Sequence, residues 1–380
     1  MVFFFFYTIV EVDIIVGRLG GVEVPLLFEG IILSCLLRMN AERTGAAVYY
    51  LLRAKKSIQT VQDAHMYNLE RFYGVYHHLN QQRFEHKLKE LMRSGLLQEN
   101  TSSQSSGTIY IPTKIGVEWI NQHRTNLSFD YYNGLKYHET GLVFLDRLTL
   151  LIQTLTNSKM KSFSFIPVID KTPIENWVRS FYKNMKPHET KLLPVLHDEL
   201  SNLLHFFPNH EARMFVDRLT GFKNYGMSVN QLADKYKMTS DDVTLLSTAI
   251  THRMLQIVEK EQSHYPFMRM LTNDLLYKSP VTASANTTYQ LLQKDYSIDN
   301  ISKMRHLKRN TIYDHIVEIA LYKADFPIDD YVSKESQQDI MNAFNKIKST
   351  KLKNIKLLVD ADISYFQIRL VLAKTKDLMK

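Results

Sequence analysis

Cysteine and glycine are scarce in this sequence, and their scarcity excludes several kinds of site. One of the 380 residues is cysteine, Cys35, which rules out a disulfide framework and a cysteine-based zinc site. None of the 13 glycines is followed by lysine, so the phosphate-binding loop G-x-x-x-x-G-K-[ST] is absent. The motifs G-x-G-x-x-G, G-x-S-x-G and H-E-x-x-H are absent as well. We therefore expect a protein that is not an enzyme and that uses neither a cofactor nor a metal ion.

A long hydrophobic run is also missing. The apolar stretch at the start, "MVFFFFYTIV", has ten residues, whereas a helix that crosses a bilayer needs about 20. Glu11 and Asp13 follow it and no basic residue precedes it, so a signal peptide or anchor is the less favoured alternative. We expect residues 1–25 to be a loosely packed extension, which a start codon assigned too far upstream would explain. The expected protein is cytoplasmic and nucleoid-associated, without membrane contact.

Acidic residues are outnumbered by basic ones, 39 against 47, which gives a formal net charge of +8. This balance favours a polyanionic partner without identifying it. Hydrophobic residues make up 45% of the chain, enough for packed cores, and 380 residues suggest two or three domains. Apolar residues recur at spacings of three and four, and few stretches alternate strictly, so the sequence predicts a mainly α fold.

Residues 26–125 are expected to form a winged-helix-like domain. Several helical segments precede two strand-like segments that flank the polar stretch 101–107, the expected wing tip. The helix before the hairpin would be the recognition helix, and three of its basic residues are candidates for DNA contact: Arg83, Lys87 and Lys89. Glu85 and Glu90 dilute this charge, and a solvated amphipathic helix explains the pattern equally well.

Residues 126–275 are expected to form a central helical domain. Within it, residues 226–258 have the pattern of a helix-turn-helix unit. Asp241 and Asp242 fall at the start of the second helix, where carboxylates stabilise the helix dipole but repel phosphate. We therefore expect this unit to have a structural or protein-binding role.

Residues 276–380 are expected to form a helical helix-turn-helix domain, centred on "ISKMRHLKRNTIYDHI" at 301–316. Its second helix would face the major groove. Seven residues of this stretch are candidates for DNA contact: Lys303, Arg305, Lys308, Arg309, Asn310, Thr311 and Tyr313. The four cations would neutralise phosphates, and the three neutral side chains would reach phosphates, sugars or base edges. The alternative is a solvated charged turn on a helical bundle.

The apolar residues around this basic turn are expected to form the packed interior of the domain. They are Ile298, Ile301, Leu307, Ile312 and Ile316.

The last hundred residues resemble the helicase helix-turn-helix domain found at the C-termini of some RecQ-type helicases. The resemblance rests on "SIDNISKMRHLKRNTIYDHI" and "ISYFQIRLVLA". The matching residues are Ile301, Arg305, Leu307, Thr311, Ile312, His315, Tyr365, Ile368, Arg369 and Ala373. Ser302 stands where alanine is usual, and Ile316 where leucine is usual. The match covers about a quarter of the chain.

The whole architecture resembles the bacterial YpbB family, through "MNAERT", "KKSIQTVQDAH" and the C-terminal domain. That family is encoded beside a RecQ-type helicase, so the resemblance implies a DNA-binding accessory protein for a helicase on another chain, in DNA repair or recombination. Two alternatives stay open. One is a winged-helix transcription regulator, and the other is a protein-interaction scaffold that makes no DNA contact.

Overall fold

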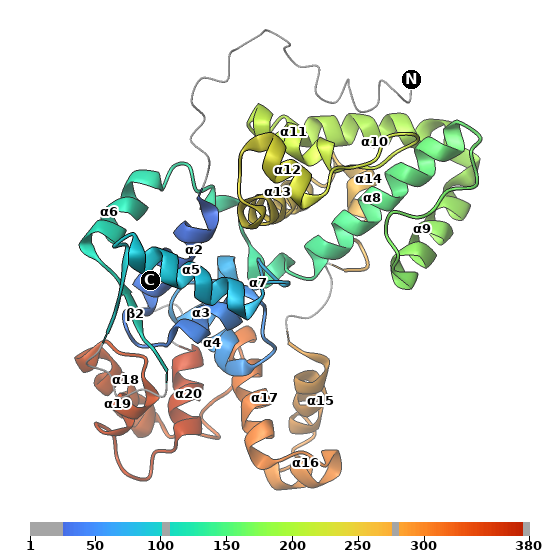
Figure 1. Ribbon diagram of the computed structural model, residues 1–380. Coiled ribbons are helices and arrows are strands. Elements are labelled where there is room, and N and C mark those ends of the chain that lie inside the picture. The colour runs from blue at the N-terminus through green and yellow to red at the C-terminus, as the bar shows by residue number, and fades with distance from the viewer. Residues whose placement is uncertain (1–25, 101–106, 276–280, 375–380) are drawn as a thin grey trace. The chain divides into compact units, whose positions relative to one another are not determined.

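The computed structural model describes residues 26–100, 107–275 and 281–374 (Figure 1). These residues are mostly helical, and their one sheet has two strands. The prediction of a mainly α fold is therefore confirmed. None of the helices in the described ranges is both long enough and apolar enough to span a bilayer. The expectations for residues 1–25 and for most of the wing tip lie outside the described residues.

The described chain divides into two compact units. The first comprises residues 26–32, 74–78 and 118–275. The second comprises residues 33–73, 79–100, 107–117 and 281–374, so it joins N-terminal helices and the C-terminal helices in one unit.

The N-terminal elements lead from helices into the hairpin. They are α2 (Leu27–Met39), α3 (Gly45–Leu52), α4 (Ile58–Met66), the 3-10 turn η1 (Glu70–Phe72), α5 (Gln81–Arg93), β1 (Leu97–Glu99), β2 (Tyr110–Pro112) and α6 (Lys114–His123). Gly95 follows α5 with φ of +72°, the left-handed conformation in which glycine avoids a Cβ clash. The strands then pair antiparallel, with Leu97 opposite Pro112. This order of elements is the one expected for a winged helix, which remains a prediction.

The first unit is built around two long helices, α8 (Thr140–Lys159) and α13 (Ser240–Lys260), which pack together. Most residues of both helices are buried. The remaining elements surround them: η2 (Phe129–Tyr131), α7 (Gly134–Tyr137), α9 (Thr172–Met185), η3 (Lys186–His188), α10 (Glu189–Leu204), α11 (Asn209–Asp217), α12 (Val229–Tyr236) and α14 (Pro266–Met270).

The C-terminal part of the second unit has six helices. They are α15 (Ala283–Leu292), α16 (Ile298–Arg305), α17 (Arg309–Tyr322), α18 (Lys334–Ile347), α19 (Leu352–Lys356) and α20 (Tyr365–Lys374). The helix α17 packs against α15, α16, α20 and also α4, and α20 packs in addition against α18 and α19 (Figure 1).

The interior of this part contains the residues that the apolar spacing predicted. Ile301, Ile312 and Ile316 have no exposed surface, and Ile298 and Leu307 are partly buried against them. Burying a branched aliphatic side chain is worth roughly 1.5–3 kcal/mol. These side chains therefore hold α16 and α17 at a defined angle and orient the basic turn between them.

Candidate nucleic-acid interface

The turn between α16 and α17 has a defined backbone geometry. Ser297 caps α16 by accepting a hydrogen bond from the Asn300 amide, and His306 ends it in the left-handed conformation, with φ of 52° and ψ of 39°. The Ser302 hydroxyl donates to the Leu307 carbonyl at 2.5 Å. Ser302 stands where the helicase helix-turn-helix domain usually has alanine, and its hydrogen bond links α16 to the turn that follows.

The N-terminus of α17 is open. Its N-cap residue is Lys308, whose side chain makes no capping hydrogen bond. The amides of a first helical turn have no intrahelical acceptors and, with the helix dipole, form an anion-binding position. Lys308, Arg309 and Asn310 are exposed around it, and Thr311 is half-buried. The Thr311 amide donates to the Lys308 carbonyl at 2.8 Å. This end of α17 therefore combines the amides of Arg309 and Asn310, which have no intrahelical acceptor, with cationic side chains.

The α12–α13 corner has the same local geometry but opposite chemistry. A three-residue turn separates its helices too, with Lys237 in the left-handed conformation. Here the N-cap Thr239 does cap the helix, accepting from the Asp242 amide at 3.1 Å. The two carboxylates that follow are buried, as Asp241 accepts from Tyr76 at 2.5 Å and Asp242 from the Phe28 amide at 3.0 Å.

These hydrogen bonds fix the start of α13 within its own unit. Burial raises the pKa of Asp242 to about 6, which reflects the cost of a charge in a water-poor site. Two carboxylates rather than cations therefore lie at the N-terminus of α13, and they would repel a phosphate.

The exposed charge at the α16–α17 turn comes from Lys303, Lys308 and Arg309. Arg309 is not entirely free, because its Nη1 lies 3.2 Å from Asp299 Oδ1. Its Nε also donates to the Tyr313 hydroxyl at 2.7 Å. No carboxylate within the described ranges pairs with Lys303 or Lys308.

Tyr313 has a positioning role in this geometry. Its ring stacks on Phe366 of α20, with the ring centroids 4.1 Å apart. Because Phe366 fixes the ring, the Tyr313 hydroxyl holds the Arg309 guanidinium at the surface. A phosphate contact by Tyr313 would share that hydroxyl with Arg309.

Arg305 is half-buried and its guanidinium is bonded to α15, whereas the sequence-based expectation places it at a phosphate. Its guanidinium donates to the Ser284 carbonyl at 2.8 Å and to the Ser284 hydroxyl at 2.9 Å, and it also donates to the Thr288 hydroxyl. These bonds join α16 to α15. His315, whose Nδ1 lies 2.8 Å from the Thr288 hydroxyl, completes the cluster. Burial, and after it the Arg305 charge, lower the pKa of His315.

The charges on α5, the expected recognition helix of the winged-helix-like domain, are partly neutralised. Arg83 and Lys89 are exposed, but the Lys87 ammonium is mostly covered and pairs with Glu90 at 2.8 Å. His86 pairs with the same carboxylate at 3.1 Å. The helix therefore presents less positive charge than the sequence suggested.

A second basic segment lies outside the sequence-predicted contact residues. Residues 340–359 contain five lysines and neither Asp nor Glu. This one-sided composition is the sequence signal for the segment.

No three His, Cys, Asp or Glu side chains in the described part of the chain are grouped to hold a metal ion.

Comparison with known proteins agrees with this geometry. Residues 284–372 match a family model described as a helix-turn-helix domain, and this span includes α16, α17 and the basic turn. Protein YpbB of Bacillus subtilis (strain 168) is 29% identical over 348 residues, which are 91% of this chain and 97% of YpbB. No solved structure matches the chain. The chain is thus similar over most of its length to YpbB and carries a helix-turn-helix domain at its C-terminal end.

Proposed function

We propose that this protein is a non-enzymatic, DNA-binding accessory protein that acts with a RecQ-type helicase on another chain, in DNA repair or recombination. The observation that carries the DNA-binding part is the open N-terminus of α17, with Lys303, Lys308 and Arg309 exposed around it. The match to a helix-turn-helix family supports the same conclusion. The helicase partnership rests on the resemblance to the YpbB family and to the helicase-type domain.

The size of the electrostatic contribution follows from the number of exposed cations. Each phosphate neutralised on duplex DNA releases counterions and contributes roughly 0.9 to the slope of log K against log[salt]. Lys303 and Lys308 together would contribute about 1.8, and Arg309, which Asp299 shares, would add up to about 0.9. In this proposal Asn310 and Thr311 lie where side chains of a recognition helix read base edges.

The proposal assigns secondary roles to the other regions. The α12–α13 helix pair has a structural role, because its two carboxylates are buried and hydrogen-bonded to other residues of the first unit. The α5 helix and the hairpin form a winged-helix-like element whose exposed Arg83 and Lys89 add weaker phosphate contacts. The protein acts in the cytoplasm, at the nucleoid, with DNA as its polyanionic partner.

The test of DNA binding is the double charge reversal Lys308→Glu with Arg309→Glu in the full chain. Affinity for duplex, forked and single-stranded DNA is measured by fluorescence anisotropy over a range of salt concentrations. We expect weaker binding and a salt slope that is flatter by one to two units on duplex DNA. Both side chains are exposed, so circular dichroism should remain native.

A matched control carries the same change in net charge elsewhere. Lys159 and Lys161 are both exposed in the first unit, and reversing both to Glu should leave the salt slope nearly unchanged. Equal slopes for the wild type and the Lys308/Arg309 variant, with both proteins folded, would remove the DNA role from this turn.

The helicase partnership needs its own experiment. Purified chain is titrated against the RecQ-type helicase of the same organism by sedimentation velocity, without DNA, and a complex is expected. A transcription regulator would instead protect one discrete site in a footprint and form no such complex. A scaffold would show no salt-dependent affinity for DNA.

A further inference from the structure

The turn between α18 and α19 carries four lysines in eight residues, "KIKSTKLK" at 346–353. Lys346, Lys348 and Lys353 are exposed and Lys351 is half-exposed. The nearest acidic residues in the sequence are Asp339 on one side and Asp360 on the other. Within the described chain, none of the four ammonium groups has a carboxylate partner.

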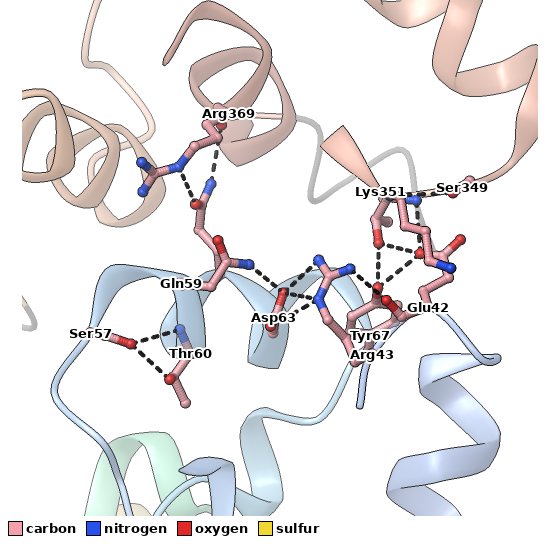
Figure 2. Close-up of polar contacts among 12 residues, drawn as sticks. Glu42, Arg43, Ser57, Gln59, Thr60, Asp63, Tyr67, Ser349, Lys351 and Arg369 are labelled. Atoms are coloured by element: carbon pink, nitrogen blue, oxygen red, sulfur yellow. Dashed lines mark hydrogen bonds and ion pairs between the residues drawn. The ribbon is translucent and has the colours of Figure 1, made fainter. Parts of the chain in front are cut away.

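The backbone of this turn is held from a distant part of the sequence. Glu42 Oε2 accepts hydrogen bonds from the Thr350 amide at 2.9 Å, the Thr350 hydroxyl at 2.6 Å and the Tyr67 hydroxyl at 2.8 Å (Figure 2). Ser349 and Thr350 are buried, and the Ser349 hydroxyl accepts from the Lys351 amide at 3.2 Å. The lysines therefore project from a rigid turn rather than from a freely moving loop.

The chain at Glu42 is anchored to α4 through the next residue, Arg43. Arg43, the next residue, pairs with Asp63 of α4 at 2.8 Å, and Gln59 donates to the same carboxylate at 2.9 Å (Figure 2). These residues belong to "MNAERT" and "KKSIQTVQDAH", segments that lie outside the helix-turn-helix match at 284–372. Their role in the structure is to form a platform beneath the lysine turn.

The same platform also contacts α17 indirectly, through Arg369 of α20. Gln62 of α4 accepts from Arg369 Nε at 3.0 Å and donates to the Arg369 carbonyl at 3.2 Å. Arg369 in turn pairs with Asp314 of α17 at 2.7 Å. One rigid N-terminal segment therefore positions both α17 and the lysine turn within a single compact unit.

Helix electrostatics explains only part of the lysine cluster. Lys346 and Lys348 lie at the C-terminal end of α18, where a positive charge gains roughly 0.3–1 kcal/mol from the dipole. Lys348, however, has φ of +47°, a conformation that costs a non-glycine residue about 1–2 kcal/mol. Lys351 is the N-cap residue of α19, where the dipole disfavours positive charge, whereas Lys353 lies within one turn of both ends of this five-residue helix. Stability alone does not account for this placement.

We propose that the α18–α19 turn is a second phosphate-binding site, which takes the backbone of DNA through Lys346, Lys348, Lys351 and Lys353. This proposal rests on the proposed DNA-binding function and extends it to a two-point grip. The first point is the N-terminus of α17 and the second is the lysine turn. The platform holds Thr350 through Glu42 and Arg369 through Gln62, and so sets the spacing between the two points.

The test replaces Lys351 and Lys353 by Gln in the full chain, which removes charge while keeping side-chain length. Salt-dependent anisotropy is measured on duplex DNA, with Lys159→Gln and Lys161→Gln as the matched control. Two lost contacts should flatten the slope by about 1.8. If the affinity at 1 M salt is unchanged, this slope corresponds to roughly 60-fold weaker binding at 0.1 M. On single-stranded DNA the flattening should be about 1.4.

A second variant guards against a folding effect. Lys346→Gln with Lys348→Asn should flatten the slope similarly and keep the fold, because Asn tolerates a positive φ better than lysine does. Thermal unfolding and circular dichroism are recorded for both variants.

The outcomes separate this site from the α17 site. Slopes like that of the wild type in both lysine variants, while Lys308→Glu with Arg309→Glu still weakens binding, overturn the second site and leave the first. Absence of any salt-dependent DNA binding by the wild type overturns both. A flatter slope in the lysine variants and an unchanged control establish the second site.

Discussion

Replacing Asp299 by Asn should strengthen DNA binding. Asp299 lies in the first turn of α16, and its carboxylate is 3.2 Å from the Arg309 guanidinium. That carboxylate competes with a phosphate for Arg309. The amide of Asn keeps the shape of the side chain but removes the charge, so Arg309 becomes fully available at the end of α17.

The expected magnitudes follow from the exposure of the pair. The two side chains are 57% and 60% exposed, and an ion pair so exposed is worth at most about 1 kcal/mol. The lost favourable interaction of Asp299 with the dipole of α16 costs about 0.3–1 kcal/mol. The domain should therefore stay folded. Making this phosphate contact fully available steepens the salt slope by up to about 0.9. If the affinity at 1 M salt is unchanged, binding at 0.1 M salt becomes up to roughly 8-fold tighter.

The assay is salt-dependent anisotropy on duplex DNA with two comparisons. Asp170→Asn removes an exposed carboxylate from the first unit and measures the effect of net charge alone. In an Arg309→Gln background, Asp299→Asn should add nothing beyond that effect, because the freed cation is missing. An Asp299→Asn protein that is folded but binds no more tightly than the Asp170→Asn control would show that Arg309 does not contact phosphate.

Two further predictions concern stability and pH. Burial is the largest single influence on the pKa of Glu42 and raises it. Hydrogen bonds from Thr350, Ser349 and Tyr67 lower the pKa and together outweigh burial, so the pKa of Glu42 lies below its ordinary 4.5. The stabilisation by this carboxylate is complete above pH 4.5 and lost as the pH falls through the lowered pKa. The difference in free energy of unfolding between wild type and Glu42→Gln should shrink on acidification, and a constant difference in denaturant titrations would contradict this. For Asp242, burial raises the pKa from 3.8 to about 6, so the folded state holds the proton more tightly and stability falls as pH rises between those values. Asp242→Asn should flatten that part of the profile in the same titrations, and a profile identical to the wild type would refute the assignment.

Much of the helical framework was readable from local patterns. The spacing of Ile301, Ile312 and Ile316 predicted a buried seam, and all three have no exposed surface. The Ser297 cap and the Gly95 stop also depend on the few residues around them. Such features are predictable because helix periodicity and capping act over three or four residues along the chain.

The fate of individual charges depended instead on tertiary packing. Arg305 and Lys308 are three residues apart and look equivalent in sequence, yet Arg305 is half-buried and bonded to α15 while Lys308 is exposed. Whether a charged group faces water or a partner depends on which distant side chains surround it. Glu42 meets Thr350 across 308 positions of sequence, and no local pattern encodes that contact. The rigid lysine turn exists because folding brings those two segments together, with buried hydrogen bonds whose loss would leave unsatisfied polar groups.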